Sequence, residues 1–140
     1  MIEMIQAITP EPINPPILDR IDISVITPTV MVDDLSKKTG ETSEEIRVAI
    51  EKVRKIQEDR FFEEKFRFNS EIPPAKLDVY CKMTDKAKNV MNRAYKAYGL
   101  SVRSYHKLIR VARTIADLDD AYYIEEKHIA EALGYRTELF

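Results

Sequence analysis

Two arginines stand where a guanidinium could reach a phosphate group. Arg20 precedes an alternating apolar run, and Arg103 falls in the first turn of a segment with helical periodicity. The planar guanidinium fork matches phosphate oxygens and stabilises the charge that develops in phosphoryl transfer. Ion pairing is the alternative for both. Asp19 or Asp22 could neutralise Arg20, and any nearby carboxylate could offset Arg103 at the positive end of a helix dipole.

A basic block surrounds Arg103. Residues 82–113 hold nine Lys or Arg and one acid, whereas the other residues hold thirteen basic and twenty-three acidic ones. Arg110 lies seven residues after Arg103 on the same helix face and is a lesser candidate for contact with a nucleotide. Arg113 follows three residues later and is expected to extend this stripe. The block indicates either a phosphate-bearing ligand or a solvated helix face.

The chain lacks the groups that hydrolyse a nucleotide. Its glycines are Gly40, Gly99 and Gly134. They cannot form a Gly-x-x-x-x-Gly-Lys-Ser/Thr loop, so a phosphate-cradling loop is excluded. His106 and His128 are not at metal-ligand spacing, and Cys81 is the lone thiol, so we expect no metal site and no disulfide. No catalysis and no bound cofactor are expected in this chain alone.

Composition and hydropathy indicate a cytoplasmic protein without a membrane partner. The net charge is −2 and 44% of the residues are apolar. No apolar run approaches the roughly 18 residues that a membrane span needs. The unpaired thiol of Cys81 and the lack of a recognisable signal peptide lead us to expect a cytoplasmic protein. Tyr95, Tyr98 and Tyr105 interleave with the basic block. Core packing is the favoured interpretation of these tyrosines, and stacking on nucleobases is the alternative.

The N-terminal part, residues 1–39, is predicted to contain an irregular arm and one short strand. Four prolines within residues 1–16 oppose regular structure. Ile21, Ile23 and Val25 then alternate with other residues until Pro28, which predicts a strand. A lone strand leaves its backbone groups without partners. Either the strand pairs with a second chain, or the rest of its sheet belongs to a longer protein of which this chain is a fragment, and we favour the fragment.

Residues 40–140 are predicted to form a helical domain. Thr42-x-x-Glu45 is a capping box, and an apolar stripe follows it at Ile46, Ala49, Ile50, Val53 and Ile56. Thr84 and Ser101 can cap two further helices. Gly99 is expected to end the first of these, and Gly134 to end the last helix of the chain. The expected helices cover about 43–62, 73–80, 84–98, 101–118 and 125–133. Five helices with short links predict an all-α bundle.

Four runs carry a family resemblance: Leu18–Ile23, Gly40–Arg47, Gly99–Leu118 and His128–Arg136. Together they closely resemble the C-terminal lid region of magnesium-chelatase-like AAA+ ATPases of the ComM/YifB group. The likeness covers residues 14–136. The true magnesium-chelatase ATPase subunit is similar more weakly, through Leu-Asp-Arg and the spacing of arginines around Leu108.

The resemblance implies roles that composition does not. Arg20 looks like the arginine finger that reaches, in trans, the ATP of a neighbouring subunit, and Arg103 looks like the sensor-2 residue on the subunit's own γ-phosphate. ComM-like members form hexameric rings and couple ATP hydrolysis to branch migration of DNA. ATP and Mg²⁺ would then belong to the full-length protein. The implied partners are the missing AAA+ core, identical neighbouring subunits and DNA.

The chain departs from the family pattern in three ways. It lacks the Walker motifs, which lie upstream in the family, it reads Asn14-Pro15-Pro16-Ile17 before Arg20, and its residues 1–12 resemble nothing specific. Three alternatives therefore stay open. The chain could be a stand-alone helical DNA-binding module that uses residues 82–113, a protein-interaction module, or part of a magnesium chelatase subunit.

Overall fold

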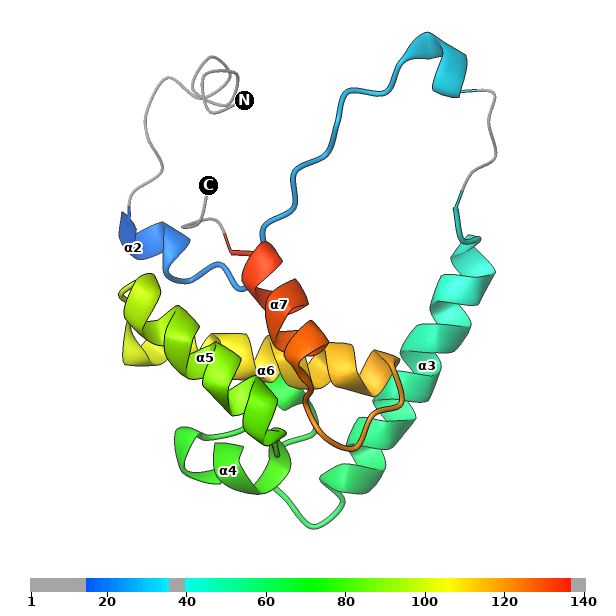
Figure 1. Ribbon diagram of the computed structural model, residues 1–140. Helices are drawn as coiled ribbons and strands as arrows, with labels where there is room; N and C mark the ends of the chain where they lie inside the picture. Colours follow the sequence, from blue (N-terminus) through cyan, green and yellow to red (C-terminus); the bar gives the residue numbers. More distant parts are fainter. Residues whose placement is uncertain (1–14, 36–39, 137–140) are drawn as a thin grey trace.

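The computed structural model describes residues 15–35 and 40–136, and its helices gather around the central helix α6, Val102–Leu118 (Figure 1). The other helices of the bundle are α3 (Ser43–Arg60), α4 (Leu77–Tyr80), α5 (Asp85–Ala97) and α7 (Glu126–Gly134). Helix α6 contacts α3, α4 and α7, and α5 packs on α7. These five helices confirm the predicted all-α bundle. A 3-10 turn at Pro74–Lys76 precedes α4.

Side-chain caps set where α3, α5 and α6 begin. Thr42 accepts a hydrogen bond from the Glu45 amide, and Glu45 accepts one from the Thr42 amide, which completes the predicted capping box of α3. Thr84 accepts from Ala87 at the start of α5. Such a cap stabilises a helix by about 1 kcal/mol because it satisfies an amide that has no partner within the helix. The helix starts are therefore local features of the sequence.

The core lies between α5, α6 and α7. Met91, Ala112 and Ile129 are fully buried, and Ile124 joins them from the loop before α7. The amide of Ile124 donates to the Lys82 carbonyl at 2.8 Å, which ties this loop to the start of α5. Cys81 is buried at the edge of the same cluster, and its burial raises the pKa of the thiol to about 11. This cysteine is therefore a packing residue and a poor nucleophile.

A buried ion network joins α3 to α6. Asp117 accepts hydrogen bonds from Arg60, from Arg113 at 3.1 Å and from the Asn69 amide group at 2.8 Å. Arg113 also donates to the carbonyls of Tyr122 and Ala121. The network thus places charge in the interior, and each of the three guanidinium nitrogens of Arg113 donates to an acceptor.

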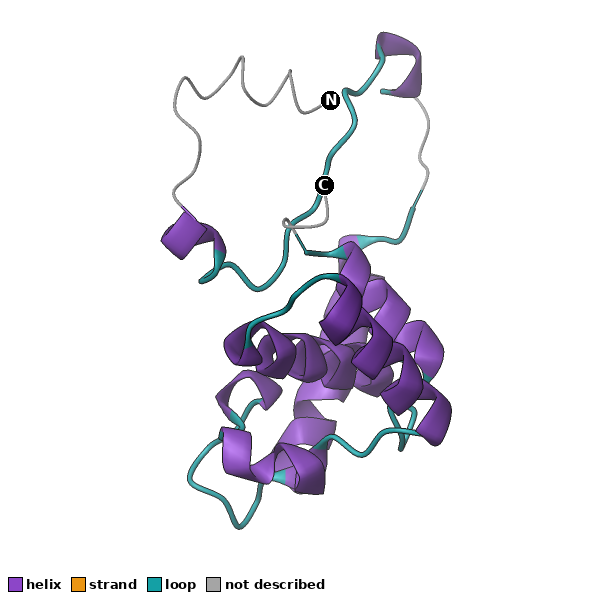
Figure 2. Cartoon of the chain, turned by 60° about the vertical axis from the view of Figure 1, so that its left-hand side comes forward, coloured by secondary structure: helices purple, strands orange, loops and turns teal. Residues whose placement is uncertain are grey.

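The predicted strand is not formed. Residues 21–31 are extended but lie in no strand within the described ranges, and Figure 2 draws them as loop. Among residues 15–35 and 40–136, one hydrogen bond between main-chain groups links them to the bundle, from the Ser24 amide to the Tyr135 carbonyl at 2.6 Å. Alternating β-branched residues favour extended backbone, but a strand also needs a partner strand, and the described residues supply none.

The irregular arm is only partly open to comparison, because residues 1–14 lie outside the described residues, as do 36–39 and 137–140. Within the rest, Pro15 and Pro16 begin a single helical turn, α2 (Pro15–Leu18). The prediction of irregular structure through Pro16 is therefore wrong. Proline is accommodated in the first turn of a helix, where its missing amide has no partner to lose.

Helix α3 buries only part of its predicted stripe. Val53 is buried, whereas Ile46 and Ile50 are close to half exposed. Figure 1 shows why: the first turns of α3 extend past the bundle, and only its second half lies against α6. No helix in the described part of the chain is long and apolar enough to cross a membrane.

Candidate phosphate-facing arginines at the start of α6

The start of α6 places Arg103 at a solvent-exposed helix end. Gly99 lies in the short link between α5 and α6. It adopts a φ of +57°, a left-handed conformation that glycine reaches at little cost. Ser101 then caps α6 by accepting a hydrogen bond from the Ser104 amide at 3.1 Å. Arg103 falls in the first turn, where unpaired amides attract anions and disfavour a cation. The local fold therefore leaves this guanidinium in need of a negative partner.

Asp19 is that partner in this structure. Its Oδ2 lies 3.6 Å from Nε of Arg103, and its Oδ1 accepts a hydrogen bond from the Ser104 hydroxyl at 3.3 Å. The Arg103 side chain remains 62% exposed. The expectation that a nearby carboxylate offsets Arg103 is thus confirmed, by a residue 84 positions earlier in the chain. An exposed pair of this kind is weak and can be exchanged for another anion.

Arg20 follows Asp19 and is exposed. Among the described residues, its side chain has no hydrogen bond and no ion pair. The alternative that Asp19 or Asp22 neutralises Arg20 is therefore wrong, because Asp19 turns to Arg103 and Asp22 to Lys107. The structure brings Arg20 near the start of α6 through Asp19 and leaves its guanidinium facing solvent.

Lys107 is a residue of this region that the sequence did not single out. Its Nζ donates to the carbonyls of Asp19, at 2.5 Å, and Ile21, at 2.9 Å, and lies 3.2 Å from Oδ1 of Asp22. The side chain is only 15% exposed. Its position one helical turn after Arg103 was the available signal, since residues four apart share a helix face.

Arg110 and Arg113 are both committed to contacts within the bundle. Nε and Nη2 of Arg110 donate to the Ile72 carbonyl at 3.0 and 2.8 Å. Arg113 is 2% exposed and belongs to the buried network around Asp117. The prediction that Arg113 extends the stripe of Arg103 is wrong, because ten residues at 3.6 per turn rotate it by about 80° from Arg103.

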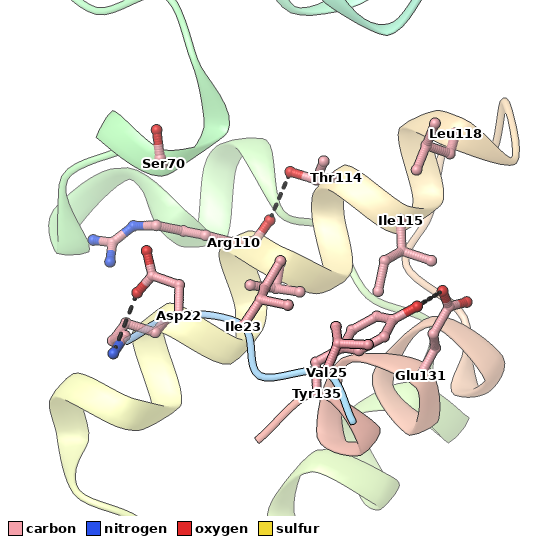
Figure 3. A pocket seen from close by; sticks show the side chains of 12 residues that line it. Asp22, Ile23, Val25, Ser70, Arg110, Thr114, Ile115, Leu118, Glu131 and Tyr135 are labelled. Carbon is pink, nitrogen blue, oxygen red and sulfur yellow. Dashed lines mark hydrogen bonds and ion pairs between the residues drawn. The ribbon is translucent and has the colours of Figure 1, made fainter. Parts of the chain in front are cut away.

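A cavity of about 470 Å³ lies beside Arg110, between the extended segment, α6 and α7 (Figure 3). Figure 3 shows Ile23, Val25 and Ile115 facing it, with Arg110 and Asp22 at one end and the Tyr135–Glu131 hydrogen bond at the other. Its walls are mainly aliphatic, which does not suit a phosphate group. The cavity is thus separate in chemistry from the exposed arginines.

The basic block divides between the two helices. On α6, Arg103, Lys107, Arg110 and Arg113 all have partners within the chain. The cations of α5 and its approach are exposed: Lys82, Lys86, Lys88, Arg93 and Lys96. The prediction that the tyrosines pack in the core is wrong for Tyr95 and Tyr98, which are 37% and 55% exposed. Tyr105 is half-buried and meets Tyr95 edge to face at 5.6 Å.

The histidines separate into a buried one and a half-buried one. His128 is fully buried, and its Nδ1 accepts from the Glu125 amide while Nε2 lies 3.1 Å from Asp119. It therefore fixes the start of α7. No group of three or more His, Cys, Asp or Glu that could hold a metal ion occurs among residues 15–35 and 40–136.

Comparison with known proteins places this sequence in a family. Residues 40–136 match the family model described as magnesium chelatase, subunit ChlI C-terminal. The chain is 39% identical over 124 residues to the competence protein ComM of Haemophilus influenzae and 31% identical over 124 residues to the uncharacterized protein YifB of Escherichia coli. Each alignment covers 87% of this chain and 24% of the relative, so the chain spans about a quarter of these proteins. The chain belongs to the magnesium-chelatase C-terminal family, within the ComM/YifB group.

Proposed function

We propose that this chain is the helical lid of a ring-forming AAA+ ATPase, in which Arg103 contacts the γ-phosphate of its own subunit and Arg20 reaches the nucleotide of the next subunit. The observation that carries the proposal is the pair of exposed guanidinium groups at the start of α6, one without a partner among the described residues and one with an exchangeable partner. Both groups are available to phosphate oxygens.

The electrostatics of Arg103 support this role. A cation in the first turn of a helix costs a few tenths of a kcal/mol, and an exposed ion pair returns about 0–1 kcal/mol. A triphosphate carries more negative charge than Asp19 and could use both the guanidinium and the dipole of α6. Nucleotide binding would then replace the Asp19 contact. In this proposal Mg²⁺ is held by the missing AAA+ core together with the phosphates of the nucleotide.

The exposed segment after Arg20 supports the missing AAA+ core as a partner. Its apolar side chains are exposed by between 39% and 80%: Ile21, Ile23, Val25, Ile26, Val30, Met31, Val32 and Leu35. A contiguous apolar stretch of this kind marks a surface that another part of a protein covers. An extended backbone without a partner strand has the same requirement. A neighbouring sheet would satisfy both.

The work that the ATPase performs is proposed from its relatives. One of them is named a competence protein, ComM, and we propose that hydrolysis drives remodelling of DNA by branch migration in a cytoplasmic hexamer. ATP and Mg²⁺ are the cofactors of the full-length protein in this proposal. Lid rotation would transmit the state of the nucleotide from Arg103 to the ring.

ATP turnover by the full-length protein tests the two roles. Arg20→Ala and Arg103→Ala should each lower turnover, by on the order of 10³-fold for a true arginine finger. Lys88→Ala, an exposed cation of α5 paired only with Asp85, is the control and should leave turnover near that of wild type. If the Arg20 and Arg103 variants also turn over ATP like wild type, the proposed roles are wrong.

The exposed cations of α5 favour a second candidate, direct binding of a nucleic acid by the helical domain alone. Lys86 and Arg93 lie seven residues apart on one face of α5, and the exposed Lys82, before the helix, and Lys96, in its last turn, add to the same basic region. Binding would show a steep salt dependence, because each neutralised phosphate releases counterions. Fluorescence anisotropy of the 140-residue chain with duplex DNA measures this. Unchanged anisotropy at low salt would remove this candidate and leave the lid proposal standing.

A further inference from the structure

We propose that Lys107 is the positioning residue for Arg20: it holds the main chain on both sides of this arginine and so sets the direction of the guanidinium. The inference deepens the proposed function and rests on it, because a fixed direction matters only if Arg20 must reach a defined group. Lys107 itself would touch neither the nucleotide nor the reacting atoms.

The ammonium of Lys107 has three N–H donors and three acceptors around it. Two are the carbonyls of Asp19 and Ile21, which flank Arg20, and the third is the Asp22 carboxylate. The two carbonyl contacts are hydrogen bonds, and the Asp22 contact at 3.2 Å is an ion pair that adds to them. The 15% exposure of the side chain makes these contacts stronger than those of an open surface pair. Figure 3 shows the Asp22 contact as a dashed line.

The other anchors of this segment act elsewhere. Arg103 and Ser104 contact only the Asp19 side chain, at 3.6 and 3.3 Å, and the Ser24–Tyr135 hydrogen bond lies four residues after Arg20. The Arg20 amide donates to the Ile17 carbonyl at 3.0 Å, within the turn that ends α2. Among the described contacts, those of Lys107 alone span Arg20 on both sides.

This arrangement fixes the backbone of Arg20 while its side chain stays free. A positioned group reacts faster because the conformational search is completed before the substrate arrives, and a misplacement of 1 Å can cost about 10² in rate. The two residues therefore have different roles. Lys107 fixes the main chain of Arg20, and the exposed guanidinium of Arg20 contacts the nucleotide of the neighbouring subunit.

Limited trypsin digestion of the 140-residue chain tests the positioning without any ATPase activity. Lys107→Met should accelerate cleavage of the Arg20–Ile21 bond by about tenfold or more, because that segment would leave the bundle more often. Lys88→Met, an exposed lysine paired only with Asp85, is the control and should cleave like wild type. Cleavage after buried Arg113 monitors unfolding and should stay slow in both variants. Equal cleavage at Arg20 in Lys107→Met and wild type would overturn the inference.

Turnover of the full-length protein tests the consequence. Lys107→Met should lower kcat by on the order of 10²-fold with little change in KM, and Lys107→Arg should recover part of the loss. Because Arg20 acts on the neighbouring subunit, Lys107→Met subunits should regain turnover when mixed with subunits that carry an inactive phosphate-binding loop but an intact Lys107. Absence of this rescue would show that Lys107 acts within its own subunit and would overturn the inference. Normal turnover in Lys107→Met with reduced turnover in Arg20→Ala would overturn the positioning role only, whereas normal turnover in both variants would overturn the proposed function as well.

Discussion

Two of the three arginines of helix α6, Arg103 and Arg113, lie ten residues apart and have opposite surroundings. Arg113 is 2% exposed and donates to one carboxylate and two carbonyls. The Arg103 side chain is 62% exposed and has a single carboxylate at 3.6 Å. The buried arginine is part of the fold, since its charge is tolerated only with complete pairing. The exposed arginine adds little to the fold and is therefore available for a ligand.

Their aspartate partners show the same contrast. Asp117 lies between two guanidiniums, those of Arg60 and Arg113, and is 2% exposed. Asp19 has one arginine partner, and its side chain is 36% exposed. A carboxylate that can be replaced by phosphate must not be essential to the fold. Exposure and the number of partners thus separate a structural arginine from a candidate ligand-binding one on the same helix.

The largest expected effect is that of Asp117→Asn. This change leaves two buried guanidiniums without their counter-ion and should lower the free energy of unfolding by about 3–5 kcal/mol. Asp19→Asn is the matched variant at the exposed pair and should cost less than about 1 kcal/mol. Urea denaturation followed by far-UV circular dichroism measures both. Equal losses in the two variants would remove the contrast between the two pairs.

Arg113→Lys comes next. A lysine keeps the charge but cannot direct donors at Asp117 and at the two carbonyls in the geometry of the guanidinium, so we expect a loss of about 2 kcal/mol. Arg103→Lys should change the free energy of unfolding by less than about 0.5 kcal/mol. The same denaturation experiment compares them. A tolerated lysine at position 113 would mean that charge alone satisfies the network.

Lowering the pH should reduce the free energy of unfolding through the buried carboxylate of Asp117. Burial raises the pKa of Asp117, but hydrogen bonds from Arg60 and Asn69 and the charge of Arg113 outweigh it and lower the pKa below the usual 3.8. The ionised carboxylate therefore contributes stability that is present above about pH 4 and is lost as the pH falls through the lowered value. Stability measured against pH should fall below pH 4 in wild type. Asp117→Asn should lack this part of the decline.

The smallest effect is expected for Arg103→Gln. Removing a cation from the first turn of α6 relieves its repulsion by the helix dipole and also removes the weak pair with Asp19, so the stability should stay within a few tenths of a kcal/mol of wild type. Thermal unfolding at low and high salt measures the balance. A loss above about 1 kcal/mol would show that Arg103 is a structural residue like Arg113.

Much of the fold could be predicted because its signals are local. The Thr42, Thr84 and Ser101 caps and the turn at Gly99 each depend on neighbours within a few residues, and all four occur where expected. Two predictions failed at least in part: the apolar stripe of α3 is only partly buried, and the strand after Arg20 is not formed. Periodicity shows which side chains could share a face, but burial of that face depends on a partner that the described chain does not provide.

The candidate site could be predicted only as a set of residue types. The sequence by itself determined that Arg103 lies in the first turn of a helix and that Arg20 starts an extended apolar run. Only the tertiary structure decided that Asp19 pairs with Arg103 and not with the adjacent Arg20. It also decided that Lys107 donates hydrogen bonds to the carbonyls on both sides of Arg20, and that Arg113 is buried. Helix caps and turns act over one turn of chain, whereas the partner of a charge is set by how segments more than 80 residues apart pack together.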